Sequence, residues 1–75
     1  MTFGQRLKKL RTERKISATQ LAKKIGITSQ TIYQWEWGIS EPRLSFLIWI
    51  ADALDISLDE LVGRSRNESG KIQSV

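Results

Sequence analysis

The sequence predicts an all-α fold, on three observations. Apolar residues recur at three- and four-residue steps through most of the chain. Ser or Thr followed three residues later by Gln or Glu, which marks a helix start, comes directly before several of these runs. No stretch alternates apolar and polar residues as a strand would, and no Asn-Gly or Asp-Gly turn is present to join two strands. The 75 residues are enough for one small domain, which we expect to contain five helices.

The first helix is predicted over about residues 2–14. Thr2 and Gln5 have the spacing of a capping box, in which each side chain accepts a backbone N–H of the other residue. Leu7 and Leu10 then recur on one face of the helix.

A second capping box, Ser17 with Gln20, predicts the next helix over about 17–25. Gly26 follows it and supplies the left-handed backbone with which many helices end. This helix is short, and the third predicted helix follows it directly.

The third helix is predicted over about 28–37. Thr28 can cap its N-terminus, Ile27 can pack on Ile32 across that cap, and Gly38 ends it. Because one residue separates the second stop signal from this cap, a tight turn joins the two helices.

The last two helices complete the predicted domain. Pro42 is placed to start the fourth helix, because its missing N–H has no intrahelical partner there. Ser57 and Glu60 form a third capping box that opens a short fifth helix, which Gly63 ends. The polar segment 64–75 is predicted to be a flexible tail. The inward stripe of the fourth helix is expected to consist of Leu44, Leu47, Ile48, Ala51 and Leu54.

Charge is distributed unevenly along the chain. Residues 1–26 hold eight Lys or Arg against one Glu, whereas residues 27–62 hold one Arg against six acidic residues. Such a basic block favours a polyanionic partner, nucleic acid or an anionic membrane, although lysines also keep helices soluble. We expect about half of these cations to be solvated and not to contact phosphate. Separately, we expect about four to six phosphate contacts per monomer, each adding about 0.9 to the salt slope of binding. The candidates are Arg6, Lys8, Lys9, Arg14, Lys15, Lys23 and Lys24.

The composition argues against several classes of protein. With no Cys and no His, and with carboxylates scattered along the chain, we expect neither an enzyme nor a metal or other cofactor site. No apolar run approaches the roughly 20 residues that span a bilayer, and the N-terminus does not resemble a signal peptide, so we expect a cytoplasmic protein. Membrane-surface binding by the basic first helix is an alternative, but insertion would compete with use of its apolar face in the core.

The third helix has two contrasting faces when its residues are set at 100° steps. Ile32, Trp35 and Glu36 share the side that anchors the helix. Gln30, Tyr33, Gln34 and Trp37 share the other side, with Ser29 at the border. Glutamine can pair with the major-groove edge of adenine, and a serine at a helix start suits a phosphate or a base edge. The helix pair therefore has the features of a helix-turn-helix, although the same residues also suit an ordinary solvated surface.

These segments resemble the Cro/CI-type helix-turn-helix family, also called the XRE family, of phage and bacterial repressors. The resemblance covers about residues 3–63, and its most specific parts are QLAKKIGITSQTIYQWEWG, PRLSFLIWIADALDISLDELVG and the pairing of Arg11 with Glu36. It implies a five-helix lambda-repressor-like domain over residues 1–63, a homodimer, and double-stranded DNA with an inverted-repeat operator as the partner.

The resemblance also implies roles for single residues. Ser29, Gln30 and Gln34 take base-reading positions, with Tyr33 near the groove wall. Ser17, Thr28 and Arg43 take positions close to phosphate, or for Arg43 alternatively the minor groove. The other predicted contacts to the DNA backbone do not come from the resemblance: they are three cations of the basic block and the aromatic residue at the end of the third helix, Arg14, Lys23, Lys24 and Trp37. Arg11 and Glu36 are expected to form a buried structural ion pair, the alternative being two solvated surface residues.

Two positions depart from the family pattern. Many members have Gln where this chain has Ala18, so a contact to phosphate is weakened, although Gln20 can partly compensate as a capping residue. Trp37 stands where members tend to have Asn, Lys or Arg. It could pack on a sugar or a thymine methyl group, or bind something other than DNA.

The remaining aromatic residues divide between core and surface. Trp35 lies on the inward stripe of the third helix and is expected in the core. Trp49 and Phe46 are expected to be more exposed, as a dimer or partner surface, or else Trp49 folds over the domain edge.

The sequence thus predicts a transcriptional regulator that represses as a dimer on DNA. With most of the 75 residues assigned to the binding domain, we expect no small-molecule ligand, and control through concentration, dimerisation or a protein partner. The alternative is an interaction module, antitoxin-like or anti-repressor, that grips a protein through Tyr33, Trp37 and Trp49.

Overall fold

The computed structural model describes residues 1–63 of the chain, and these form five helices. They are α1 (Phe3–Glu13), α2 (Ala18–Ile25), α3 (Ser29–Glu36), α4 (Leu44–Leu54) and α5 (Leu58–Val62). The predicted all-α, five-helix fold is confirmed. The predicted flexible tail, 64–75, lies outside the described residues.

The helices begin where the side-chain caps predict, with one exception. The capping boxes at Thr2 and Ser17 are complete, and Ser57 accepts the N–H of its own third helical residue. The exception is α4, which has Arg43 at its N-cap and no side-chain cap hydrogen bond. Pro42 therefore precedes the helix, and the prediction that it starts α4 is wrong by two residues.

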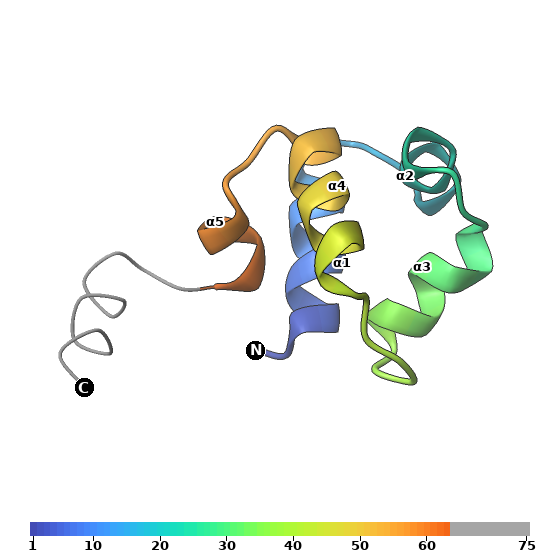
Figure 1. Ribbon diagram of the computed structural model, residues 1–75. Coiled ribbons are helices and arrows are strands. Elements are labelled where there is room, and N and C mark those ends of the chain that lie inside the picture. The colour runs from blue at the N-terminus through green and yellow to red at the C-terminus, as the bar shows by residue number, and fades with distance from the viewer. Residues whose placement is uncertain (64–75) are drawn as a thin grey trace, which may run out of the picture.

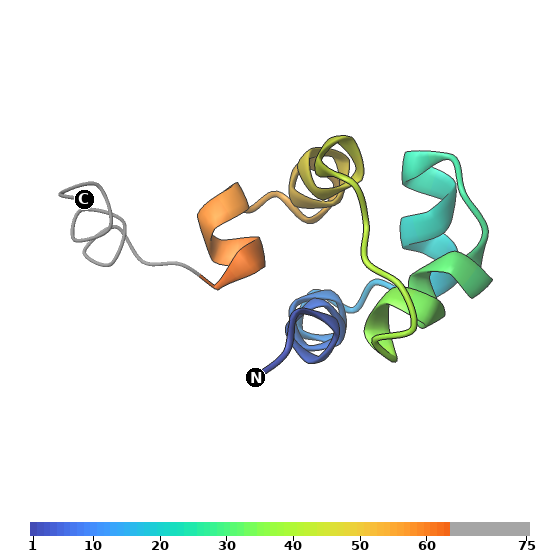
Figure 2. The ribbon, with the colours of Figure 1, turned by 60° about the horizontal axis from the view of Figure 1, so that its bottom comes forward.

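The five helices are arranged in three groups (Figures 1 and 2). α1 and α4 occupy the middle of the molecule, α5 lies on one side of them, and α2 and α3 lie together on the other. The packing agrees, since α1 contacts both α3 and α5, and α4 contacts both α2 and α5. The two central helices therefore pack against the pair α2 and α3.

One apolar cluster forms the core and receives side chains from all five helices. Such burial is the main favourable term in the folding of a small domain. The fully or nearly fully buried members are Leu7, Leu10, Ala18, Leu21, Ala22, Ile32, Trp35, Ile50, Ala51, Leu54 and Leu61.

The inward face of α4 differs from the predicted stripe. Ile50 is completely buried, whereas Leu44 and Ile48 are 64% and 43% exposed, so the prediction that these two face the core is wrong. The helix carries apolar residues on nearly every side, interrupted by Ser45 and Asp52. Its sequence pattern therefore does not define which side is buried.

Gly4 brings the start of α1 into close contact with the end of α3. It is buried, and a Cβ added to it would collide with the backbone carbonyl oxygens of Trp35 and Glu36. The neighbouring atoms belong to the backbone and cannot rotate away as a flexible side chain could. Gly4 thus allows an approach between these two helices that no larger residue permits.

Candidate nucleic-acid interface

A three-residue turn connects α2 to α3. Gly26 ends α2 in the left-handed region, at φ 79°, and the N–H of Ile27 donates to the Ala22 carbonyl over 2.9 Å. Thr28 then caps α3 by accepting the N–H of Thr31. These local bonds and the packing of α2 on α3 fix the relative orientation of the two helices.

The inward face of α3 is anchored in the core. Ile32 is completely buried, and Trp35 is 4% exposed. The Glu36 side chain is also buried, at 3% exposure, beside Arg11 of α1. An isolated eight-residue helix is not stable in water, so these three contacts determine where α3 lies.

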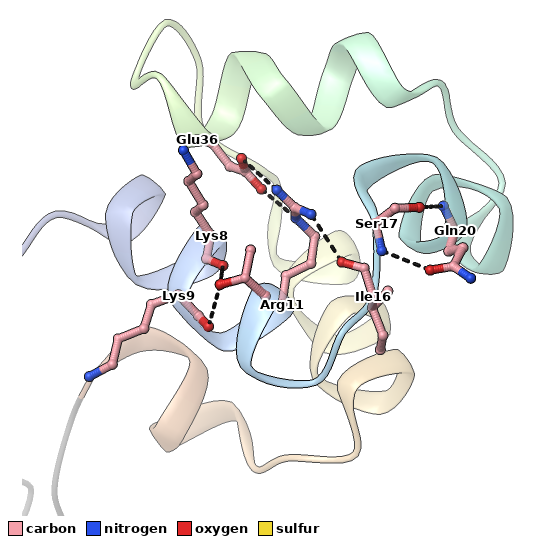
Figure 3. A network of polar contacts seen from close by, with 8 residues as sticks. Lys8, Lys9, Arg11, Ile16, Ser17, Gln20 and Glu36 are labelled. Atoms are coloured by element: carbon pink, nitrogen blue, oxygen red, sulfur yellow. Dashed lines mark hydrogen bonds and ion pairs between the residues drawn. The ribbon is translucent and has the colours of Figure 1, made fainter.

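Arg11 is the centre of a polar network behind α3 (Figure 3). Its Nε lies 2.8 Å from Glu36 Oε2, its Nη2 lies 3.1 Å from Glu36 Oε1, and its Nη1 donates to the Ile16 carbonyl over 3.0 Å. The bidentate geometry is the strongest that an arginine and a carboxylate can adopt. The network joins α1, the α1–α2 connection and the C-terminal end of α3.

A row of aromatic rings links α3 to α4. The Trp35 and Phe46 centroids are 5.6 Å apart, and Phe46 meets Trp49 edge-on at 5.2 Å. Trp49 is 47% exposed, but Phe46 is half-buried between the two tryptophans and packs against the core. Phe46 is therefore less exposed than Trp49, and its assignment to a dimer or partner surface stays a prediction.

The outward face of α3 is open to solvent. Gln30, Tyr33 and Trp37 are exposed, and Ser29 and Gln34 are partly exposed. Within residues 1–63, no side-chain hydrogen bond engages the amides of Gln30 or Gln34. Their donors and acceptors are therefore available to a partner.

The start of α2 presents backbone donors beside two polar side chains. Ser17 Oγ accepts the Gln20 N–H over 3.0 Å, and Gln20 Oε1 accepts the Ser17 N–H over 2.8 Å (Figure 3). Gln20 thus acts as a capping residue, and its amide nitrogen is not used by the cap. Ala18 is buried and contributes no polar group. The remaining N–H groups of the first turn point away from the helix and form a potential anion site.

The basic side chains fall into two groups, exposed cations and arginines that bond to backbone carbonyls. Lys23 of α2 and Arg43 at the start of α4 are exposed. Lys24 is exposed too, but it lines a surface pocket of about 450 Å³ between α2 and α4, with Trp49 and Asp52.

Arg6 and Arg14 form intramolecular bonds. Arg6 Nε donates to the Glu60 carbonyl over 2.7 Å. Arg14 Nε donates to the Leu54 carbonyl over 3.0 Å, and its Nη1 donates to the Leu10 carbonyl. Both arginines therefore connect α1 to the α4–α5 part of the fold, and nothing in the sequence distinguishes them from the other cations.

Two kinds of site were sought in the part of the chain that the structure describes. Residues 1–63 contain no group of three or more His, Cys, Asp or Glu side chains able to hold a metal ion. Over the same residues, each helix is too short or too polar to cross a membrane.

The paired helices agree with a known family of sequences. A family model described as Helix-turn-helix matches residues 7–61, which include all of α2, α3 and α4. The chain belongs to the Cro/CI-type helix-turn-helix family, also called the XRE family. This family consists of DNA-binding transcription regulators and is not a class of enzymes.

The similar curated proteins include two named as repressors, one named as an activator and others named as transcriptional regulators. The chain is 40% identical over 63 residues to the immunity repressor protein of Bacillus phage phi105, covering 84% of this chain and 44% of that protein. It is 39% identical over 66 residues to the uncharacterised HTH-type transcriptional regulator YqaE of Bacillus subtilis, covering 88% and 57%. The chain thus spans about half the length of these relatives.

A solved XRE structure has the same fold. The P22 c2 repressor, crystallised in complex with a synthetic operator, is 31% identical with a TM-score of 0.78, and the match covers 87% of this chain and 98% of that one. The lambda-repressor-like fold expected from the sequence is confirmed. In this fold, α2 and α3 are the two helices of the helix-turn-helix.

Proposed function

We propose that residues 1–63 are the DNA-binding domain of a transcriptional repressor that reads the major groove of double-stranded DNA with α3. The observation that carries the proposal is the contrast across this helix. Its inward side chains, those of Ile32, Trp35 and Glu36, are buried in the fold. On its outward face, the amides of Gln30 and Gln34 have no partner among the described residues. Family membership supports the same role.

The base-reading contacts are assigned to the exposed polar residues of α3. A glutamine amide carries a donor and an acceptor, which match the N6 and N7 atoms of adenine in the major groove. Gln30 and Gln34 lie one turn apart and can contact successive base pairs. Ser29 lies at the N-terminal end of the helix, and Tyr33 lies beside the glutamines, toward the groove wall.

Phosphate contacts are assigned to helix starts and exposed cations. The first turns of α2 and α3 have free N–H groups next to Ser17 and Thr28, and helix N-termini favour anions. Lys23 and Arg43 add positive charge. Lys24 remains a candidate, although it lines the pocket beside α4. Arg14 is left out of the proposed interface because its guanidinium binds backbone carbonyls.

A two-fold symmetric dimer is proposed on the side of α4 away from α2. Leu44 and Ile48 lie one turn apart there, and Val62 is exposed at the end of the neighbouring helix α5. Trp49 is on a different side of α4, next to Lys24, and is not assigned to the dimer. A dimer of this kind would bring two copies of α3 into successive major grooves about 34 Å apart, which requires an inverted-repeat operator.

Selection of bound duplexes from a random pool tests the proposal. We expect enrichment of a short inverted repeat, and weaker binding to a scrambled duplex of the same composition. The binding constant should fall steeply with salt, by about 0.9 in the logarithmic slope for each phosphate contact. Absence of any enriched sequence would contradict the proposal.

The second candidate is a protein-interaction module on the same scaffold. It is favoured by the exposure of Trp37 and Trp49, 69% and 47%, which is high for tryptophan in a small domain. Such a module would enrich no duplex and would bind a partner protein through these rings. The selection experiment therefore distinguishes the two functions.

A further inference from the structure

Two aromatic rings are stacked on the outward face of α3. The centroids of Tyr33 and Trp37 are 5.7 Å apart with an interplanar angle of 16°. Trp37 is 69% exposed and Tyr33 39% exposed, so the pair presents an apolar surface to solvent. The N–H of Trp37 donates to the Tyr33 carbonyl over 2.8 Å, which keeps the backbone of Trp37 in helical geometry.

This pair lies in line with the proposed base-reading residues. Trp37 lies seven positions after Gln30, so their side chains leave the helix within about 20° of each other, about 10 Å apart along the axis. A duplex whose bases reach Gln30 and Gln34 therefore brings an adjacent part of the same half-site toward Trp37. The position of the two rings relative to Gln30 and Gln34 therefore limits which part of the duplex the rings can contact.

The chemistry of the rings restricts the contact further. The faces of the two rings are apolar and uncharged, whereas the polar atoms of the pair, the Tyr33 hydroxyl and the Trp37 indole N–H, lie at the ring edges. The apolar group that the major groove displays is the C5 methyl of thymine, with deoxyribose carbons along the wall. Resting on the proposed function, we infer that the Tyr33–Trp37 pair reads a thymine methyl group at one position of each half-site, beside those that the glutamines contact.

The inference has a second consequence, for salt dependence. Because residue 37 is a tryptophan and not a cation, it makes no charged contact to a phosphate. Trp37 therefore contributes nothing to the salt slope of binding. A lysine placed there would add about 0.9 per monomer. At this position the chain therefore has a contact that discriminates thymine from the other bases, and lacks the sequence-independent phosphate contact that a lysine would make.

Uracil substitution isolates the methyl group. In the duplex enriched by selection, each thymine is replaced in turn by deoxyuridine, which removes the methyl and keeps every hydrogen-bonding atom. We expect a loss of about fourfold in affinity at one thymine per half-site, the equivalent of one buried methylene. The Trp37→Lys variant should lose this discrimination and bind with a steeper salt slope.

Two matched variants complete the experiment. Trp37→Phe keeps an apolar ring and should retain most of the discrimination, whereas Gln30→Ala should lose base preference at a different position and keep the methyl effect. Because residue 37 is exposed, folding is checked by circular dichroism and is expected to be unchanged in both Trp37 variants.

The possible results separate this inference from the function on which it rests. Enrichment of an operator with no methyl effect at any thymine, or with the same effect in Trp37→Lys, would overturn the inference and leave the DNA-binding function standing. Enrichment of no duplex would overturn both, and would point to a protein partner for these rings.

Discussion

The two faces of α3 differ in what determines their side-chain positions. On the inward face, Ile32, Trp35 and Glu36 are each held by residues of other helices. On the outward face, Tyr33 and Trp37 stack on each other, within the same short segment. The inward side chains are thus positioned by contacts with other helices, whereas the two outward rings stack on each other, one from α3 and one from its C-cap.

This difference means that stability and recognition are carried by different residues of one eight-residue helix. Substitutions on the inward side should change the free energy of unfolding, and their effect on binding should follow from unfolding or displacement of α3. Substitutions on the outward side should change binding with little effect on stability. The following predictions test this separation, beginning with the largest effect.

Arg11→Ala is expected to cost about 3–5 kcal/mol of unfolding free energy, because it leaves the buried Glu36 carboxylate without its partner. This is a large part of the stability of a small domain, so the variant should be unfolded or nearly so. Thermal and urea denaturation followed by circular dichroism measure the effect. Lys9→Ala, at an exposed position of the same helix, is the matched control and should change little. An Arg11→Ala melting temperature within a few degrees of the wild type would contradict the role of the buried pair.

Gly4→Ala is expected to cost about 1–3 kcal/mol, although alanine is the better helix former. The added Cβ meets the backbone of Trp35 and Glu36, so α1 and the end of α3 must move apart. Urea denaturation and operator affinity should both show a loss. Lys8→Ala, one turn away and exposed, controls for substitution in α1. Stabilisation of the Gly4 variant would show that the two helices can separate at no cost.

Thr28→Ala removes the side-chain cap of α3 and is expected to cost about 0.5–1 kcal/mol. Thr28→Ser keeps the hydroxyl acceptor and should retain most of the stability. The comparison is made by differential scanning calorimetry. Equal melting temperatures for Thr28→Ala and the wild type would mean that packing alone fixes the start of α3.

The sequence predicts the helices well because their end signals are local. Thr2 with Gln5, and Ser17 with Gln20, form the capping boxes that their spacing predicts, and Gly26 adopts the predicted left-handed backbone. In each case, the physical cause lies within a few residues of the chain. The same is true of the two faces of α3, since helical periodicity assigns them.

The sequence predicts poorly those features that depend on distant parts of the chain. The orientation of α4 was missed, with Ile50 buried in place of Ile48, because apolar residues surround that helix. Arg14 resembles the other cations until the fold brings the Leu54 carbonyl to it. Gly4 has no local signal at all, since its cause is the backbone of a helix about thirty residues away.

The double variant Gln30→Ala/Gln34→Ala tests the central claim most directly. Its melting temperature and its affinity for the selected duplex are measured together, the latter by fluorescence anisotropy with a labelled duplex and a scrambled competitor. We predict a change in unfolding free energy within about 0.5 kcal/mol, and a large loss of preference for the selected duplex over the scrambled one, since each bidentate glutamine–adenine pair contributes about 1–3 kcal/mol of discrimination. Undiminished preference for the selected duplex in a folded double variant would show that the outward face of α3 does not read the sequence.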